Sequence, residues 1–546
     1  SDLRFDMDNF KKYKSKTISI ISFIIFILLQ LITLVPPIIM KNIVDEYIPK
    51  NSVDKIFLGI FLFVLIPFTY ITIQAIFNYI TIVFARKNGN KLSIDILSNL
   101  INQNKSFFDK NNSVELATYA SKESVNYINF YVSELPKYYG FIIICVVIFG
   151  LILRYSIYLS LLQLFIIPLA IFPIKIISSK LDKNIRSVLE NNAKSNQIRA
   201  DIFKRIDTVK SLRIENQKID EVKVINSKTS KIWGKIAALD MITGIWMTGF
   251  LSMLFTGLTF GIGAYIISQN IEMISIGELI SILSLVSILY VNINNIFRTN
   301  IEIKKHDAEN HKLFSYLTLI GEDTKDKINL NSIDSIKINK LSFSYNENKS
   351  IIKDFDFECK KGDFIGLIGK SGVGKSTIFN LLLKFYDVEN NTIFYNDIDI
   401  NKINPLSIRD NVTKISQQID LFPGTIEYNL RLSNKEVSNE EIHEILKFVK
   451  LDNYISSLEE GINTDIGEAG KLMSGGEMQR LALAQGLLRK NNVLLLDEIT
   501  SNIDKNTEKI IKENILKLHN TGEYIIIAIS HNKEFLEDCD KIYELK

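Results

Sequence analysis

Long apolar runs separated by charged stretches fill the first 300 residues of the chain. The run 17–40 carries no charged residue, and as a helix it would measure about 36 Å, enough to cross a bilayer core of about 30 Å. It is too long for the apolar core of a signal peptide, and similar runs follow it, so we expect a retained membrane span. The further spans predicted are 56–85, 136–153, 156–177, 241–267 and 278–299.

Charged residues set the expected orientation of these six spans. Basic residues flank the first span at Lys11–Lys16 and the second span at Arg86–Lys91, and the positive-inside bias makes these ends cytoplasmic. The third and fourth spans are joined tightly around Arg154, which predicts a hairpin. Six crossings return the chain to the cytoplasm near residue 300, and we expect a membrane domain over residues 1–320.

The connections on the cytoplasmic side are long and charged, whereas those on the outer side are short. Apolar residues recur at helical spacing in the inner connections 86–135 and 178–236, for example over 92–101. Because Pro and Gly are scarce where the spans leave the membrane, we expect the membrane helices to continue far into the cytoplasm. The alternative is a pair of separate soluble helical hairpins.

Polar residues inside the predicted spans are mostly neutral. In lipid such side chains either line a pathway or form interhelical hydrogen bonds, and both interpretations stay open. A pathway with this lining would favour an amphipathic or uncharged cargo. The residues are Gln30, Gln74, Asn78, Gln163, Asn292, Asn294 and Asn295.

Composition excludes some classes of protein. The net charge is +3 over 546 residues, so the strongly basic footprint of a nucleic-acid-binding protein is absent. Three cysteines at no ligand spacing suggest neither a disulfide framework nor a zinc site. Enrichment in Ile, Asn and Lys is typical of an AT-rich bacterial genome. The first residue is Ser, which leaves open a segment upstream of residue 1.

After a polar linker at 321–335, the pattern over 336–546 changes to short strands and helices. An apolar strand, the loop Gly369-x4-Gly374-Lys375-Ser376 and a helix follow one another over 363–383. The backbone N–H groups of such a loop wrap phosphate oxygens. Lys375 would reach the β- and γ-phosphates, and Ser376 would hold Mg²⁺. The sequence therefore predicts an α/β P-loop NTPase domain that uses ATP and Mg²⁺.

Two further apolar strands end in residues suited to the same chemistry. The run "NVLLLDE" places Asp497 and Glu498 at a strand's carboxyl end, where α/β sheets bind ligands. Asp497 would hold Mg²⁺, and Glu498 would deprotonate the attacking water. His531 follows "YIIIAIS" and would contact the γ-phosphate. The alternatives are an ordinary acidic strand end and a core histidine.

Together these residues resemble the ATP-binding cassette (ABC) transporter family, and more narrowly a half-size exporter with six spans and one cassette. "GKSGVGKST" resembles the family's phosphate loop, "VLLLDE" its catalytic strand, "MSGGE" its signature and "SNID" (501–504) its D-loop. Gln417 matches the family's glutamine that contacts magnesium. Glu468, just before the signature, matches an exporter element that touches the cytoplasmic ends of the membrane domain. The resemblance implies nucleotide contacts from Tyr345, Gly369, Lys370, Ser371, Gly372, Val373, Gly374, Lys375, Ser376, Thr377, Ser474, Gly475, Gly476, Glu477 and Asp504. It also implies catalytic roles for Lys375, Gln417, Glu498 and His531, and metal binding by Ser376, Gln417 and Asp497.

The SGG turn of the signature is a second anion site, because a helix start exposes N–H groups and carries positive potential. In the family resembled, this turn closes on the γ-phosphate held by a partner chain, which implies a dimer around two ATP molecules. We expect a homodimer, with a heterodimer as the alternative. Ser474 could instead only cap its helix. Glu477, in place of the usual Gln, adds a carboxylate that is unfavourable near phosphate unless it points away.

The sequence thus predicts an ATP-driven exporter in the cell membrane, with its cassette in the cytoplasm. The cargo would be a peptide, lipid or drug. By resemblance, the tips near 112–123 and 210–218 would rest on the cassettes as coupling helices. One alternative is a peptide exporter with a leader-cleaving domain ahead of residue 1. Another is an ATP-gated channel or signalling partner, although gating alone needs no hydrolytic residues.

Overall fold

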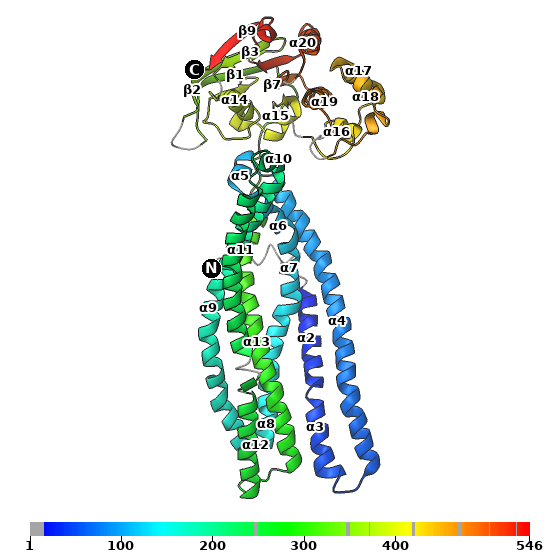
Figure 1. Cartoon of the computed structure of the whole chain (residues 1–546), viewed down its shortest axis with the longest axis vertical. Coiled ribbons are helices and arrows are strands. Elements are labelled where there is room, and N and C mark those ends of the chain that lie inside the picture. Colours follow the sequence, from blue (N-terminus) through cyan, green and yellow to red (C-terminus); the bar gives the residue numbers. More distant parts are fainter. Residues whose placement is uncertain are drawn as a thin grey trace. The chain divides into compact units, whose positions relative to one another are not determined.

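The computed structural model describes residues 16–244, 249–250, 252–345, 350–370, 372–417, 421–467, 472–501, 503–530 and 532–545. These residues form two compact units (Figure 1). The membrane unit holds the described residues up to Asn102 and those of Lys110–Leu319. The cassette unit holds the described residues from Ile320 onward together with Gln103–Asp109, a segment that the sequence analysis placed with the membrane helices.

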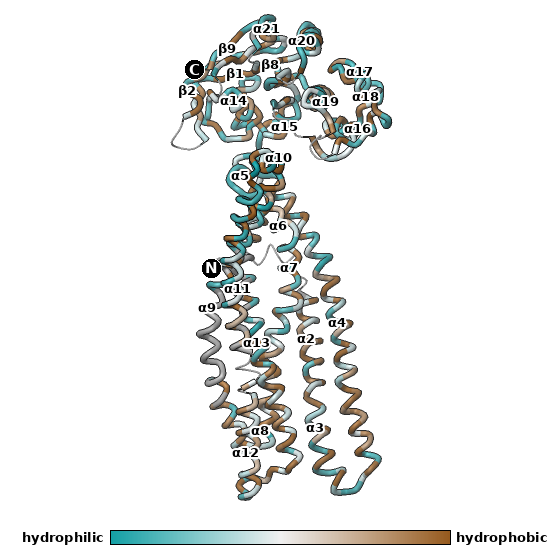
Figure 2. Tube along the Cα trace, in the orientation of Figure 1, coloured by the Kyte–Doolittle hydropathy of each residue, from teal (hydrophilic) through white to brown (hydrophobic). Residues whose placement is uncertain are grey.

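Long helices build the membrane unit, and Figure 2 shows apolar residues concentrated along much of their length. Continuous helices run from two predicted spans into the inner connections, so the alternative of separate soluble hairpins is wrong. The helices are α2 (Lys16–Ile32), α3 (Val35–Asn42), α4 (Val53–Ile101), α8 (Leu135–Tyr155), α9 (Ile157–Lys204), α11 (Glu215–Gly244), α12 (Ser252–Ser268) and α13 (Ile276–Leu317).

Two predicted spans differ in detail from the observed helices. The first is divided between α2 and α3, because proline in the first turn of α3 lacks the N–H that an unbroken helix would need there. The fifth, 241–267, is divided between α11 and α12, and residues 245–248 and 251 of it lie outside the described residues. Four described helical segments are long and apolar enough to cross a membrane: Thr17–Tyr47, Val53–Ile101, Ser113–Tyr155 and Ile276–Asn300.

Hydrogen bonds between neutral side chains join three membrane helices at one level. Gln163 of α9 is fully buried; its Nε2 donates to Thr259 Oγ1 of α12 at 2.9 Å. Tyr290 of α13 donates to Gln163 Oε1 at 3.3 Å. At this position the interhelical interpretation of the neutral polar residues is therefore correct, with a contribution of about 0.6 kcal/mol for each hydrogen bond.

Two sheets form the cassette unit. A parallel sheet has the order β6-β7-β8-β3-β9, and an antiparallel sheet has the order β2-β1-β4-β5. Strands β7 and β8 are wholly buried, as their uninterrupted apolar runs predict. The parallel strands are β3 (Phe364–Gly369), β6 (Val412–Ile415), β7 (Val493–Asp497), β8 (Ile525–Ile529) and β9 (Lys541–Leu545). The antiparallel strands are β1 (Ser335–Phe343), β2 (Ile352–Lys360), β4 (Ile393–Tyr395) and β5 (Ile398–Asp399).

Helices flank these sheets and carry several of the predicted motifs. The observed architecture, a helical membrane region followed by an α/β domain with a P-loop, confirms the predicted fold class. The helices are α14 (Lys375–Leu382), α15 (Pro405–Asn411), α16 (Ile426–Arg431), α17 (Asn439–Phe448), α18 (Asp452–Ser457), α19 (Gly475–Leu487), α20 (Lys505–His519) and α21 (Lys533–Leu536).

Short helices lie between the long ones in the inner connections. They are α5 (Lys105–Lys110), α6 (Ser113–Thr118), α7 (Ser124–Asn129) and α10 (Ile206–Ser211). Almost all of α5 belongs to the cassette unit, and it precedes the expected tip at 112–123. The linker at 321–335 also packs on the cassette, because Arg409 forms two hydrogen bonds of 2.6 Å with the carboxylate of Glu322.

Candidate nucleotide site

The phosphate loop connects β3 to α14 and depends on glycine for its shape. Gly374 has a φ of +105°, in the left-handed region, and a Cβ there would lie 2.7 Å from the Ile351 side chain. A Cβ on Gly369 would lie 2.8 Å from the Leu545 carbonyl oxygen. A larger residue at either position would displace the chain, so the loop follows from the glycine spacing. Ser371 lies outside the described residues.

Lys375 bridges this loop from the start of α14. Its Nζ donates to the carbonyl oxygens of Gly369 at 2.8 Å and Lys370 at 3.0 Å, and its side chain is buried. These hydrogen bonds hold the ammonium group against the backbone that would surround phosphate oxygens. A triphosphate offers the same group charged acceptors, which form stronger hydrogen bonds than carbonyls do.

Asp497 and Ser376 meet beside the loop. Asp497 ends β7 and is only 4% exposed. Burial raises the pKa of its carboxyl group, while a hydrogen bond with Ser376 and the positive charge of Lys414 act in the opposite direction. A hydroxyl and a carboxylate are oxygen ligands of the kind that Mg²⁺ binds beside phosphates. These residues therefore fit a magnesium ion.

Glu498 follows Asp497 in a strained conformation that other residues hold in place. Its φ is +51°, its N–H donates to the Ile529 carbonyl at 2.9 Å, and its own carbonyl accepts from Gln479 Nε2 at 2.8 Å. Gln417 donates to its carboxylate. The fold thus brings together two predicted catalytic side chains, at the edge where β7 ends.

Gln479 is a residue that sequence reasoning missed. It is 1% exposed and lies in α19, the helix that follows the signature. Besides the carbonyl of Glu498, its amide contacts the Ser501 hydroxyl at 3.4 Å. A glutamine on an otherwise apolar buried face was the signal available, because a buried amide needs a partner.

Tyr345 lies beside the phosphate-loop helix. Its hydroxyl donates to Thr377 Oγ1 at 3.2 Å, and the residue is 40% exposed. The Tyr345 ring makes edge-on contacts with Phe343, at 5.1 Å between ring centroids, and with Tyr386, at 5.0 Å. An exposed aromatic face next to a phosphate loop can stack on a base.

The signature residues begin α19 with a capping box. Ser474 Oγ accepts from the Glu477 N–H at 3.3 Å, and the Glu477 carboxylate accepts from the Ser474 N–H at 2.7 Å. Ser474 therefore caps its helix. The Glu477 carboxylate is engaged with its own helix start, where the N–H groups favour negative charge.

Asp504 caps α20 in a similar way. Its carboxylate accepts from the Thr507 N–H at 3.0 Å, and this hydrogen bond with the backbone lowers the pKa of Asp504. Glu468, Asn502 and His531 lie outside the described residues. In the described part of the chain, no group of three or more His, Cys, Asp or Glu could hold a metal ion.

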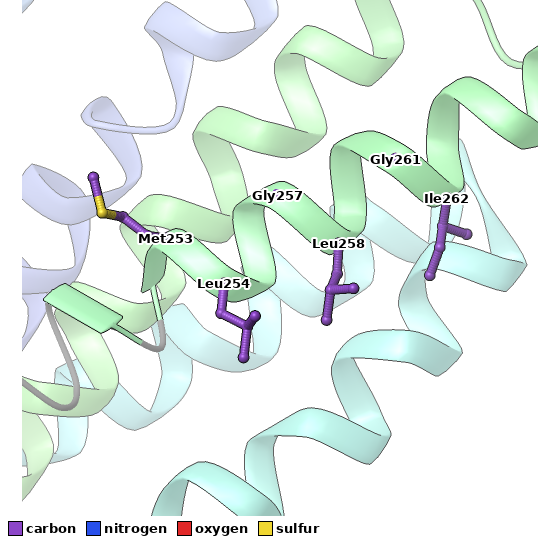
Figure 3. A pocket seen from close by; sticks show the side chains of 6 residues that line it. All are labelled: Met253, Leu254, Gly257, Leu258, Gly261 and Ile262. Atoms are coloured by element: carbon purple, nitrogen blue, oxygen red, sulfur yellow. The ribbon is translucent and has the colours of Figure 1, made fainter.

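An apolar hollow of about 540 Å³ lies on α12 in the membrane unit. Figure 3 shows Leu254, Leu258 and Ile262 projecting from the same side of this helix. A Cβ added to Gly257 or Gly261 would meet no neighbouring atom of the described residues within 4 Å, so the surface between the leucines is open. The lining residues are Met253, Leu254, Gly257, Leu258, Gly261 and Ile262.

A phosphate loop with carboxylates at the neighbouring strand ends, carried on membrane-spanning helices, defines the class of nucleotide-driven membrane transporters. The family model described as "ABC transporter" matches residues 352–501. The model described as "ABC transporter transmembrane region" matches residues 19–293. The chain belongs to the ABC transporter family, as a half-size exporter with one transmembrane region and one ATPase domain.

Relatives and a solved structure extend over nearly the whole chain. A putative export ATP-binding/permease protein of Rickettsia conorii is 28% identical over 92% of this chain and 87% of its own length. The multidrug resistance-like ATP-binding protein MdlA of Buchnera aphidicola is 29% identical over 97% and 92%. The fold is similar to that of a bacterial Atm1-family ABC exporter with ATP bound, with a TM-score of 0.86, 20% identity and coverage of 97% and 93%.

These findings confirm the predicted ATPase coupled to transport, the membrane location and the cytoplasmic cassette. They identify an exporter and an ATP-binding domain.

Proposed function

We propose that this chain exports an amphipathic or hydrophobic cargo, a peptide, lipid or drug, by alternating access. The observation that carries the proposal is the contact between Gln417 and Glu498 beside Ser376 and Asp497. ATP hydrolysis needs a general base (Glu498), a metal site (Ser376 and Asp497) and the glutamine that contacts magnesium (Gln417) in one place. An ATP-gated channel would need ATP binding alone.

The roles of the nucleotide-site residues follow from their chemistry. The phosphate loop and Lys375 bind the triphosphate, Tyr345 stacks on the adenine, and Glu498 holds and deprotonates the attacking water. His531 contacts the γ-phosphate. Ser376, Gln417 and Asp497 would hold Mg²⁺, which supplies positive charge against the phosphate oxygens. Gln479 fixes the backbone of Glu498 and so positions its carboxylate.

A second copy completes each site. The signature turn, Ser474–Gly476 with Glu477, presents the start of α19 to the γ-phosphate bound by the partner, and Asp504 lies at the D-loop beside it. Two copies in two-fold symmetry enclose two ATP molecules. Reversing an open-to-closed ratio of 99:1 takes about 5.5 kcal/mol of differential affinity, which two enclosed triphosphates can provide. Hydrolysis removes this stabilisation and resets the cycle.

The cargo class follows from the membrane unit. The polar residues in the spans are mostly neutral, and the hollow on α12 is lined by apolar side chains and glycine. Surfaces of this kind favour uncharged or amphipathic molecules, including membrane lipids.

The direct test is transport in inside-out vesicles. Fluorescent lipids, hydrophobic dyes and peptides are supplied outside with ATP and Mg²⁺, and uptake is compared with the Glu498→Gln variant. We expect ATP-dependent uptake of at least one amphipathic compound. The ATPase rate should rise when that compound is present. Ion current without ATP turnover would contradict the proposal and indicate a channel.

A further inference from the structure

One tyrosine of the cassette fixes the end of the short helix α5. Tyr386 lies four residues after the end of α14 and is 9% exposed. Its hydroxyl donates to Asp109 Oδ2 at 2.5 Å. Burial and the neighbouring Asp109 carboxylate raise the pKa of Tyr386, so the hydroxyl keeps the proton that it donates.

The ring of the same tyrosine supports the aromatic residue beside the phosphate loop. Tyr345 meets Tyr386 edge-on at 5.0 Å, and Phe343 contacts Tyr386 at 5.9 Å. Tyr345 in turn donates to Thr377 of the phosphate-loop helix. A continuous series of contacts therefore runs from Asp109 through two tyrosines to the nucleotide site.

The neighbouring residue holds the start of α5. The ammonium group of Lys105 lies 5.8 Å from the centroid of the Phe385 ring, and the guanidinium group of Arg409 lies 5.2 Å from it. Arg409 also binds Glu322 of the linker through two hydrogen bonds. Phe385 and Tyr386, adjacent in sequence, thus contact the two ends of α5. Cation–π contacts of this kind contribute modestly, whereas a hydrogen bond to a carboxylate contributes more.

We propose that Tyr386 is a positioning residue with two separable parts. Its hydroxyl holds α5 in place through the hydrogen bond to Asp109, and its ring supports the Tyr345 ring in the orientation that stacks on the nucleotide. The second part rests on the proposed adenine contact of Tyr345.

The first experiment isolates the hydroxyl and needs no nucleotide. Amide hydrogen exchange of segment 103–110 is measured in the full chain in nanodiscs. Tyr386→Phe keeps the ring and should speed exchange about tenfold, because it removes a hydrogen bond to a charged group. Asp109→Ala should have the same effect, the double variant should add nothing further, and Asp109→Asn should restore part of the protection. Unchanged exchange in Tyr386→Phe would overturn the proposal.

Tyr395→Phe is the matched control. Tyr395 is fully buried in the same hydrophobic core, and its hydroxyl donates to the Leu382 carbonyl at 2.6 Å instead of to α5. Equal acceleration of exchange over 103–110 in this control would show a general loss of stability and overturn the assignment.

The second experiment tests the ring through ATPase kinetics. Tyr386→Phe should leave the KM for ATP within about twofold of wild type, whereas Tyr386→Leu should raise it about tenfold because Tyr345 loses its support. An equal KM in both variants would overturn the role of the ring. A wild-type chain without ATPase activity would refute the proposed function, and the exchange experiment would still test the hydroxyl.

Discussion

At the scale of single residues, Glu477 shows how local chemistry decides the effect of a substitution in a motif. A carboxylate near phosphate is unfavourable in isolation, yet here it accepts the Ser474 N–H and completes a capping box. The sequence contained this information, since Ser-x-x-Glu at a helix start is a known capping pattern. The resemblance drew attention to the missing glutamine instead.

Replacing Glu477 separates its capping role from its charge. Glu477→Ala should destabilise the cassette by about 1 kcal/mol because it removes one half of the capping box. Glu477→Gln keeps a side-chain oxygen at the same place and should keep the ATPase rate within about twofold. Thermal unfolding and phosphate release measure the two effects. Loss of activity in Glu477→Gln with unchanged stability would show that the charge itself is needed.

Asp497 links burial to metal binding. Burial raises the pKa of its carboxyl group, so folding favours the protonated form, and this group stabilises the folded state more as the pH falls toward that pKa. Asp497→Asn mimics the protonated form and keeps an acceptor for Ser376. It should raise the melting temperature of the nucleotide-free protein and flatten its pH dependence below neutrality, while abolishing Mg²⁺-dependent hydrolysis. A lower melting temperature at neutral pH would contradict this account.

Glu498 is the residue whose replacement tests the hydrolytic step. Glu498→Gln removes the proposed base but keeps a polar group of the same shape next to Gln417. ATP binding should persist while phosphate release falls at least about 100-fold, since general-base catalysis contributes that much. Equilibrium binding of a fluorescent ATP analogue and single-turnover kinetics separate the two steps. Normal turnover would remove Glu498 from its assigned role.

At the scale of elements, the hydrophobic pattern predicted most of the fold, because helical spacing continues from the spans into the inner connections. It also predicted the strand ends at Asp497 and Glu498. The hydrophobic pattern could not predict that α5 lies against the cassette. Asp109 and Tyr386 are 277 positions apart, and their contact forms only in the packed domain. For the same reason, the contact of Gln417 with Glu498, 81 positions apart, came only from the structure.

The packing of α2 against α8 depends on Gly140. A Cβ there would lie 2.3 Å from the ring of Phe26, which also meets Phe141 edge-on at 5.0 Å. Gly140→Leu should therefore force the helices apart and cost on the order of 1–3 kcal/mol. Thermal stability in detergent measures the effect. Gly150→Leu on the same helix is the control, because its Cβ would meet nothing within 4 Å among the described residues; equal loss in both variants would contradict the packing argument.

At the scale of the whole molecule, each nucleotide in the proposed mechanism is bound by two chains. Ser474 keeps its hydrogen bonds within its own helix, and Lys375 keeps its bonds within its own loop. In the proposed mechanism, the start of α19 contacts the γ-phosphate that the phosphate loop of a second copy binds. Lys375 binds a triphosphate that the second copy's signature turn contacts. Symmetry then gives two equivalent sites, and closure at both draws the membrane helices together.

Complementation between two inactive copies tests this requirement most directly. Lys375→Ala lacks the phosphate contact, and Ser474→Arg lacks the signature contact, so each variant alone should be inactive. A mixed dimer, isolated with two affinity tags, holds one site with an intact loop from one copy and an intact signature from the other. We predict that it recovers up to about half of the wild-type ATPase rate. A mixed dimer as inactive as its parents would contradict the shared site.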